Sequence, residues 1–226
     1  DIRVDLINNV LTPLLTMPKV GKSIPMTENV DPIEVIVSEA EIAVFQTEGL
    51  PSDKVSAENA AIVLSSVRYP LLIDPQLQAI TWIKKKEEKT LKLGRLGQSN
   101  LIKELLRAIE DGVPFLIENM GESIDPSLMP IISRMSIKRG SKKFIQIGDA
   151  EVEINPAFRL YLHTKLNNPH YPPEIQAETT MVNFSVTQKG LEEQLLGLVV
   201  RFERPDLAAQ RSALIMQQNL FTIRVQ

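Results

Sequence analysis

An acidic residue stands at the junction between a strand-like and a helix-like segment, a place where proteins often bind nucleotide phosphates. The apolar run Leu71 to Ile73 ends at Asp74, and Pro75 and Gln76 lead into the helix-like segment. A phosphate-binding junction reads G-x-x-x-x-G-K-[ST], because its glycines bring backbone N–H groups to the phosphates while the lysine and hydroxyl serve charge and Mg²⁺. Residues 69–79 contain no glycine, lysine, serine or threonine. The junction therefore has the layout of a nucleotide-binding loop without its phosphate ligands.

Asp74 followed by Pro75 is the usual order of a helix N-cap and a first-turn proline. We therefore expect the Asp74 carboxylate to occupy the anion site at the helix N-terminus. A phosphate ~4 Å away would be repelled by about 1 kcal/mol in water and about 4 kcal/mol near a protein surface. This predicts that the junction binds no ATP and that the module holds no cofactor. The alternative is an ATP-hydrolysing enzyme with an atypical loop, in which Gln76 and Gln78 contact the phosphates.

A second acidic residue follows the strand-like run Phe115 to Ile117. In a nucleotide hydrolase, an acidic pair at this place binds Mg²⁺ and polarises water. Here Glu118 is followed by Asn119, which cannot act as a base. We interpret both residues as polar contacts at a strand end. The positions of the degenerate nucleotide pocket are then Asp74, Pro75, Gln76, Glu118 and Asn119.

The two histidines give little sign of a metal site. His163 and His170 lie seven residues apart, with Glu174 after them, and prolines surround His170. A zinc site needs three or four converging ligands, so we interpret both histidines as packing or loop residues and expect no metal. No Ser-His-Asp set is present, and no catalytic residue is predicted.

Four basic residues gather in the stretch 137–143, namely Lys138, Arg139, Lys142 and Lys143. Such a cluster could contact an acidic partner or nucleic acid. No aromatic residue is interleaved with the four charges, which favours a solvated approach to a hairpin expected over 144–147 and 152–154. A third functional class, a nucleic-acid adaptor, depends on this cluster alone.

The composition gives no global sign of a nucleic-acid or membrane partner. The chain has 226 residues and a formal net charge of −3, so its charges nearly balance. It lacks cysteine, which excludes disulfides and thiolate metal sites and fits a reducing compartment. A run of ~18 apolar residues and a basic-then-apolar leader are both missing, so we expect no membrane span. Because the chain begins with Asp1, we expect it to be a piece of something longer.

Ordered elements must position these residues, and the pattern changes near residue 70. Before it, Ser38 and Glu41 form a capping box for a helix that Gly49 ends, and Ser56 is expected to cap a second helix. From Leu71 on, strands and helices alternate, which favours a parallel sheet with helices on both faces. The expected strands are 71–73, 90–96, 115–117, 158–164 and 181–184, and the expected helices are 75–88 and 100–111. Two helices follow, separated by Pro205, and the first carries an apolar stripe of Leu191, Leu195, Leu198, Val199 and Phe202.

Short sequence matches in a fixed order extend over residues 49–207. They include Gly49-Leu50-Pro51-Ser52-Asp53, Ile73-Asp74-Pro75-Gln76, Trp82-Ile83-Lys84, Glu118-Asn119-Met120-Gly121-Glu122, Asn168-Pro169-His170-Tyr171 and Glu203-Arg204-Pro205-Asp206-Leu207. In these matches the chain resembles the fifth AAA+ module of dynein heavy chains, the axonemal ones most. Residues 1–48 match more loosely.

The resemblance implies an α/β fold of the AAA+ type, a parallel sheet flanked by helices with a degenerate nucleotide loop and an inserted β-hairpin. It also implies three parts. Residues 1–48 would be a helical connector from the preceding module, and residues 49–204 the large α/β subdomain. Residues 205–226 would begin a C-terminal helix that leads to a small subdomain and a strut.

The resemblance further implies a non-catalytic module of a motor ring, which relays conformational change in ATP-driven movement along microtubules. Expected partners are the neighbouring AAA+ modules of the same heavy chain and other dynein chains. The microtubule would be reached only through the whole motor, and neither nucleic acid nor membrane would be a partner. ATP and Mg²⁺ would belong to the whole motor, located in the cytoplasm and cytoskeleton, in the ciliary axoneme.

Overall fold

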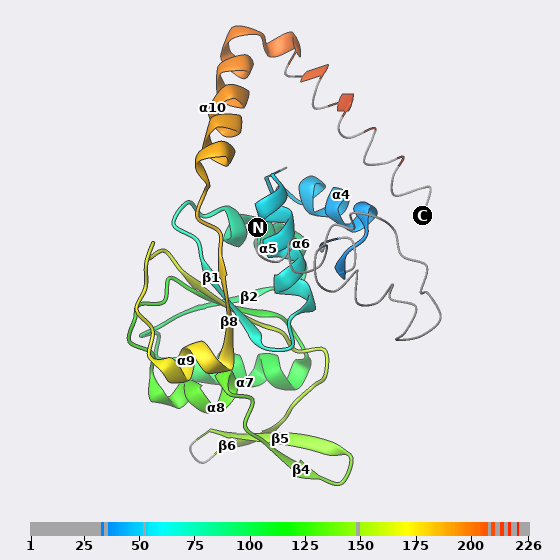
Figure 1. Ribbon diagram of the computed structural model, residues 1–226. Coiled ribbons are helices and arrows are strands. Elements are labelled where there is room, and N and C mark those ends of the chain that lie inside the picture. The colour runs from blue at the N-terminus through cyan, green and yellow to red at the C-terminus, as the bar shows by residue number, and fades with distance from the viewer. Residues whose placement is uncertain are drawn as a thin grey trace, which may run out of the picture.

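The computed structural model describes residues 33, 36–51, 53–147, 150–207, 209–210, 213–214, 217 and 221. Its centre is a five-stranded sheet in the order β2-β3-β7-β1-β8 (Figure 1). The strands are β1 Tyr69–Ile73, β2 Lys92–Arg95, β3 Phe115–Glu118, β7 Leu160–Thr164 and β8 Thr179–Asn183. All neighbouring strands are parallel, so their carboxyl ends meet at one edge. The predicted parallel sheet is confirmed.

Helices cover both faces of this sheet. On one face lie α4 (Glu39–Thr47), α5 (Lys54–Ser65) and α6 (Gln78–Lys86), and on the other lie α7 (Leu101–Asp111), α8 (Met129–Ile132) and α9 (Pro173–Glu178) (Figure 1). Successive side chains of a strand point to opposite faces. Leu71 of β1 therefore packs in the cluster that contains Leu105 of α7, whereas Leu72 packs in the cluster that contains Trp82 of α6. The two hydrophobic cores hold the strand ends in place.

Local sequence signals explain where several helices begin and end. α4 begins at the predicted capping box, in which the Ser38 hydroxyl accepts the N–H of Glu41 at 3.3 Å and the Glu41 carboxylate accepts the N–H of Ser38 at 2.9 Å. α7 ends at Gly112, whose φ of 72° is a conformation that glycine adopts without strain. The expectation for α5 is wrong. Its N-cap is Asp53, which accepts the N–H of Ser56, so Ser56 lies in the first turn.

A second sheet of three antiparallel strands is inserted between β3 and β7. It contains β4 (Ser136–Arg139), β5 (Lys142–Ile147) and β6 (Ala150–Glu153), in that order. The predicted hairpin corresponds to β5 and β6, but β4 is an additional strand. The basic stretch 137–143 is therefore part of the sheet and is not an approach to it. All side chains of β4 are exposed, so the sequence shows no apolar alternation there.

The remaining differences concern element ends and short elements. β2 is shorter than the expected 90–96, β7 begins two residues later than expected, and β8 begins two residues earlier. The 3₁₀ helix η2 (Pro126–Leu128), α8 and α9 are not predicted, because none is long enough to show a helical period. The first 32 residues of the expected connector lie outside the described residues.

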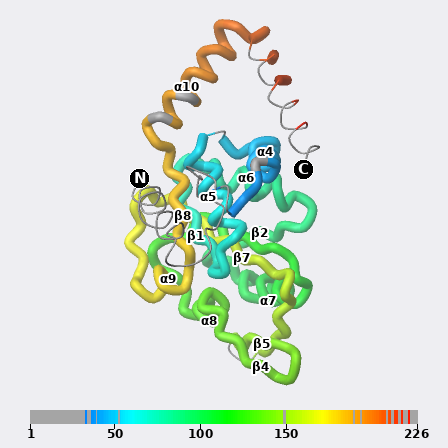
Figure 2. The backbone as a smooth tube through the Cα atoms, turned by 45° about the vertical axis from the view of Figure 1, so that its right-hand side comes forward, coloured from blue at the N-terminus to red at the C-terminus, as the bar shows by residue number. Residues whose placement is uncertain are grey.

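After β8, the helix α10 (Gln188–Glu203) extends away from the sheet (Figure 2). Its N-cap is Thr187, whose hydroxyl accepts the N–H of Gly190 at 3.1 Å. The predicted apolar stripe is present, and each of its side chains is about half exposed or more, namely Leu191, Leu195, Leu198, Val199 and Phe202. Of the helix expected beyond Pro205, the structure describes residues 205–207 and a few single positions as helical.

Candidate functional site at the carboxyl ends of the strands

Asp74 follows β1 directly, and its side chain is fully buried. Its Oδ1 accepts the N–H of Gln78 at 2.9 Å, and its Oδ2 accepts the N–H of Ile80 at 3.0 Å. The expectation that this carboxylate occupies the helix N-terminus is confirmed. The expected helix start at Pro75 is wrong, because a turn with a left-handed Leu77 (φ 62°) comes first and α6 begins only at Gln78. Asp74 thus reaches forward across the turn and is not itself the N-cap.

The Asp74 carboxylate takes the place that a phosphate would need. A helix start leaves four N–H groups without an intrahelical partner, and these groups together with the helix dipole attract anions. Two of them already donate to a charged acceptor, which makes strong hydrogen bonds. A phosphate could approach them only by displacing Asp74 or by lying beside its negative charge.

His163 of β7 lies beside Asp74 and is also fully buried. Its Nε2 is 3.7 Å from Asp74 Oδ2, and its Nδ1 accepts the backbone N–H of Asn119 at 3.2 Å. Because Nδ1 acts as an acceptor, a neutral ring carries its proton on Nε2, which faces the carboxylate. A distance of 3.7 Å is too long for a hydrogen bond, so this contact is electrostatic. These contacts connect the ends of β1, β3 and β7, which are neighbours in the sheet.

Glu118 is the last residue of β3, and two cations hold it. Its Oε1 is 2.5 Å from Lys84 Nζ, and its Oε2 is 3.1 Å from Arg95 Nη2. Burial acts to raise the pKa of the Glu118 carboxyl, but the hydrogen bonds and charges of Lys84 and Arg95 outweigh it, so the pKa is lowered overall. The predicted polar contact is confirmed for Glu118. Asn119 makes its contact to His163 through its backbone and has a left-handed φ of 54°.

A cavity of about 290 Å³ opens beside these residues. Its lining contains three cationic side chains, Lys84, Arg95 and Lys165, and one carboxylate, that of Glu118. An anion could therefore be attracted to the cavity. The cations on Glu118 keep it ionised, so it is a poor proton donor, and their hydrogen bonds occupy oxygens that a Mg²⁺ ion would need. Gln76, a candidate phosphate contact, is exposed and does not line the cavity.

Sequence reasoning misses three residues of this site. The signal for His163 is a single polar, ionisable side chain near the end of the apolar strand Leu160–Thr164. Lys84 and Arg95 give no sequence signal for their contact with Glu118, because they come from α6 and β2, far apart in the chain. Only the fold brings these three segments together.

The other predicted candidates do not form a site. His163 is fully buried, whereas the His170 side chain is 81% exposed and lies 3.7 Å from Glu122 Oε1. Within the described ranges, no group of three or more His, Cys, Asp or Glu side chains could hold a metal ion. No helix in the described part of the chain is long and apolar enough to cross a membrane.

Comparisons with known proteins give the wider context. Residues 43–226 match the family model described as the ATP-binding dynein motor region. The chain is 52% identical over 206 residues to the flagellar outer arm dynein alpha chain of Chlamydomonas reinhardtii, 52% identical over 221 residues to the ciliary dynein beta chain of Heliocidaris crassispina, and 48% identical over 221 residues to dynein axonemal heavy chain 9 of Homo sapiens. These alignments cover 90%, 98% and 98% of this chain but only 5% of each relative.

Proposed function

Since this chain belongs to the family of ATP-binding dynein motor regions, we propose that it is a mechanical module of a motor ring that neither binds nor hydrolyses nucleotide itself. Its fold is that of an AAA+ motor region, a parallel sheet flanked by helices. In this proposal the chain forms the large α/β part of the fifth AAA+ module of an axonemal dynein heavy chain. It relays conformational change between neighbouring modules while ATP and Mg²⁺ bind elsewhere in the motor.

The observation that carries this proposal is the Asp74 carboxylate on the N–H groups of Gln78 and Ile80. A phosphate beside it would meet like-charge repulsion of about 4 kcal/mol near a protein surface, which lowers affinity about a thousandfold. Displacing Asp74 would instead leave a carboxylate buried without its hydrogen bonds, which is also costly. The family description names ATP binding, and this proposal restricts that property to other parts of the relatives.

The surroundings of Glu118 support the same conclusion for hydrolysis. Lys84 and Arg95 already neutralise this carboxylate, so a Mg²⁺ ion would have to compete with two cations. The next residue is Asn119, whose amide cannot accept a proton from water. Binding of Mg²⁺ and activation of water are thus both disfavoured.

The relatives suggest the setting of this module. Their names place them in flagellar outer arms, cilia and axonemes, and we infer a location in the cytoskeleton of the ciliary axoneme. The apolar stripe of α10 supports contact with further parts of the same heavy chain, such as neighbouring AAA+ modules. Other dynein chains are further partners in this proposal, and the microtubule is reached only through the whole motor.

Isothermal titration calorimetry of the 226-residue chain with Mg²⁺–ATP and Mg²⁺–ADP tests the proposal. We expect no saturable binding with a Kd tighter than about 1 mM. A circular dichroism melt of the same sample must show a cooperative transition, so that a lack of binding comes from a folded chain. A Kd in the low micromolar range, equivalent to about −8 kcal/mol, would contradict the proposal.

A second candidate function is an ATPase with an atypical loop, and the cationic cavity of about 290 Å³ favours it. This alternative predicts measurable phosphate release that Glu118→Gln abolishes. The exposed Glu122 provides a control, because Glu122→Gln makes the same chemical change outside the cavity. If the wild-type chain releases no phosphate above the buffer blank, the alternative is eliminated.

A further inference from the structure

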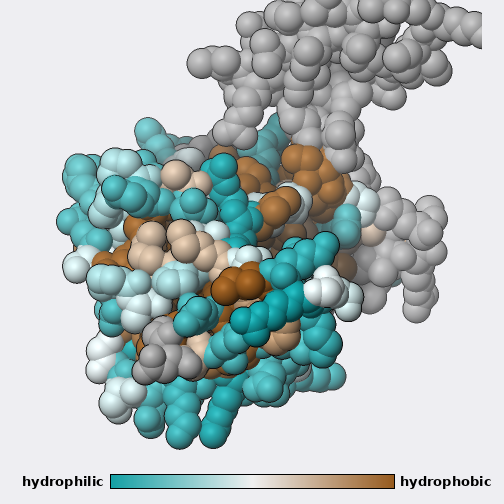
Figure 3. All heavy atoms as spheres, turned by 90° about the horizontal axis from the view of Figure 1, so that it is seen from below, coloured by the Kyte–Doolittle hydropathy of each residue, from teal (hydrophilic) through white to brown (hydrophobic). Residues whose placement is uncertain are grey.

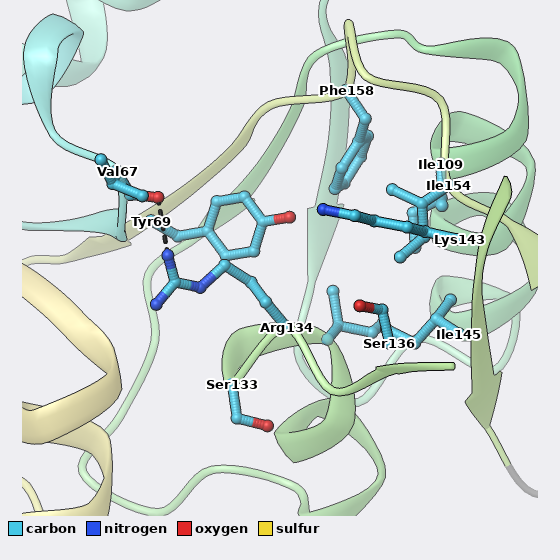
Figure 4. Close-up of a pocket in the computed structure, with 11 residues that line it drawn as sticks. Val67, Tyr69, Ile109, Ser133, Arg134, Ser136, Lys143, Ile145, Ile154 and Phe158 are labelled. Carbon is cyan, nitrogen blue, oxygen red and sulfur yellow. Dashed lines mark hydrogen bonds between the residues drawn. The ribbon is translucent and has the colours of Figure 1, made fainter. Parts of the chain in front are cut away.

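A larger cavity, of about 470 Å³, lies between the main sheet and the inserted sheet (Figure 4). Tyr69, the first residue of β1, lines it, so it is at the opposite end of that strand from Asp74. Its volume is in the range of known ligand sites, roughly 300–1,000 Å³. Most of its wall is apolar, with Ile109, Ile131, Ile145, Ile154 and Phe158.

One face of the inserted sheet borders this cavity. Directly opposite residues of an antiparallel pair lie on the same face, and Ser136 is opposite Ile145 while Lys138 is opposite Lys143. Ser136, Lys143 and Ile145 all line the cavity, so Lys138 lies on that face as well. Like charges directly opposite each other are destabilising. The sheet thus carries an unfavourable lysine pair next to the cavity.

The charges on the two faces of the inserted sheet are treated differently. On the outer face, each cation has a carboxylate partner, Arg139 with Glu151 at 3.1 Å and Lys142 with Glu153 at 2.7 Å. On the cavity face, Lys138 and Lys143 have no carboxylate within ion-pair distance among the residues that the structure describes. This face therefore presents uncompensated positive charge.

Arg134 adds a third cation to the cavity wall. Its Nη1 donates to the Val67 carbonyl at 2.8 Å (Figure 4). Its Nε is buried and has no hydrogen-bond partner in the described part of the chain, which costs free energy. Its φ of 55° is uncommon for a residue other than glycine. The Lys143 ammonium and the Tyr69 hydroxyl also project into the cavity (Figure 4).

We propose that this cavity binds a polypeptide segment in which a large apolar side chain is adjacent to carboxylates. The apolar side chain contacts the isoleucines and Phe158, while the carboxylates face Lys143 and Lys138 and relieve their mutual repulsion. Charge complementarity selects an acidic segment. The apolar wall selects a peptide over a nucleic acid, because a phosphate backbone gains nothing from isoleucine side chains. Because the chain spans 5% of its relatives' length, most of the polypeptide around it lies outside these residues.

The surface around the insert agrees with such a ligand. Viewed from this end, the molecule is largely hydrophilic, with hydrophobic side chains in patches between the hydrophilic ones (Figure 3). An acidic segment with one large apolar residue matches this mixed character. The proposal does not depend on the nucleotide site, which lies at the other end of β1.

Fluorescence anisotropy with a synthetic probe tests the inference. The probe is a fluorescein-labelled peptide of sequence Gly-Asp-Glu-Phe-Leu-Asp-Glu, added to the 226-residue chain without nucleotide. We expect saturable binding in the micromolar range. Replacing the two apolar residues of the peptide by alanine, or its acids by lysine, should each weaken binding about tenfold or more.

Variants of the chain distinguish the cavity from general surface charge. Lys143→Glu should weaken binding about tenfold or more, whereas Lys142→Glu, with the same change in charge on the outer face, should change it less than about twofold. Ser136→Trp should also weaken binding because it fills the cavity. Both lysines are exposed, so these variants should fold, and Lys143→Gln is a milder second variant.

Three results would overturn the inference. The first is no saturable binding to the folded wild-type chain, as verified by circular dichroism. The second is an equal loss for Lys143→Glu and Lys142→Glu, which would mean that only net charge matters. The third is binding of a duplex DNA as tight as that of the peptide, which would indicate nucleic-acid recognition by the basic residues.

Discussion

Replacing Asp74 by alanine should destabilise the chain more than the loss of an ordinary helix cap. Removal of an N-cap costs about 0.5–2 kcal/mol, typically about 1. Asp74, however, is fully buried and accepts two N–H groups, at 2.9 and 3.0 Å. Each hydrogen bond to a charged group contributes about 1.5–3 kcal/mol, and the N–H of Ile80 would be left buried without an acceptor. We therefore expect Asp74→Ala to lower the free energy of unfolding by about 3 kcal/mol or more.

Urea unfolding followed by circular dichroism measures this loss. The matched control is Asp125→Ala, because Asp125 is an exposed cap that accepts only one N–H, from Ser127 at 2.9 Å. This control should lose at most about 1 kcal/mol. Equal losses in the two variants would refute the reasoning from burial and double acceptance. Asp74→Ala should also leave ATP binding undetectable in calorimetry, because no glycine, lysine or hydroxyl takes over the phosphates.

Further predictions concern stability and association. The pKa of Glu118 is lowered from its ordinary value of 4.5, so its stabilising effect is present above that pH and is lost as the pH falls through the folded pKa. Urea midpoints of the wild type and Glu118→Gln should thus differ at pH 7 and converge in acid. Gly94→Ala should cost about 1–3 kcal/mol, because the new Cβ would lie 2.5 Å from Leu101 Cδ1, whereas Gly121→Ala meets nothing within 4 Å and serves as its control in the same unfolding assay. Leu195→Asp on the exposed α10 stripe should keep the circular dichroism spectrum and reduce self-association in sedimentation velocity.

Much of the fold could be predicted from local signals in the sequence. The Ser38–Glu41 capping box and Gly112 mark helix ends, because their chemistry requires only neighbouring residues. The alternation of apolar strands and amphipathic helices predicts the parallel sheet and both covered faces. Short or exposed elements such as α9 and β4 are not predictable in this way, since they have neither a period nor a buried face.

The candidate site could be predicted only in part. The order Asp74-Pro75 correctly indicates a carboxylate at a helix start, but Pro75 misplaces that start because the reach of the side chain across the turn depends on Leu77. The contacts of Glu118 with Lys84 and Arg95 span 34 and 23 residues, and such pairings follow from strand order and not from spacing in the sequence. The sequence therefore indicates which chemistry is missing, while the structure shows what has replaced it.

The buried contacts among Asn119, His163 and Asp74 also affect how the molecule can move. They join three adjacent strand ends to the first amides of α6, so the start of this helix cannot fray independently of the sheet. In hydrogen–deuterium exchange, the amide of Ile80 should then exchange only as slowly as the whole domain unfolds, unlike the amides at most helix starts. A displacement at this edge would reach α6 undiminished, because the junction is a stiff joint.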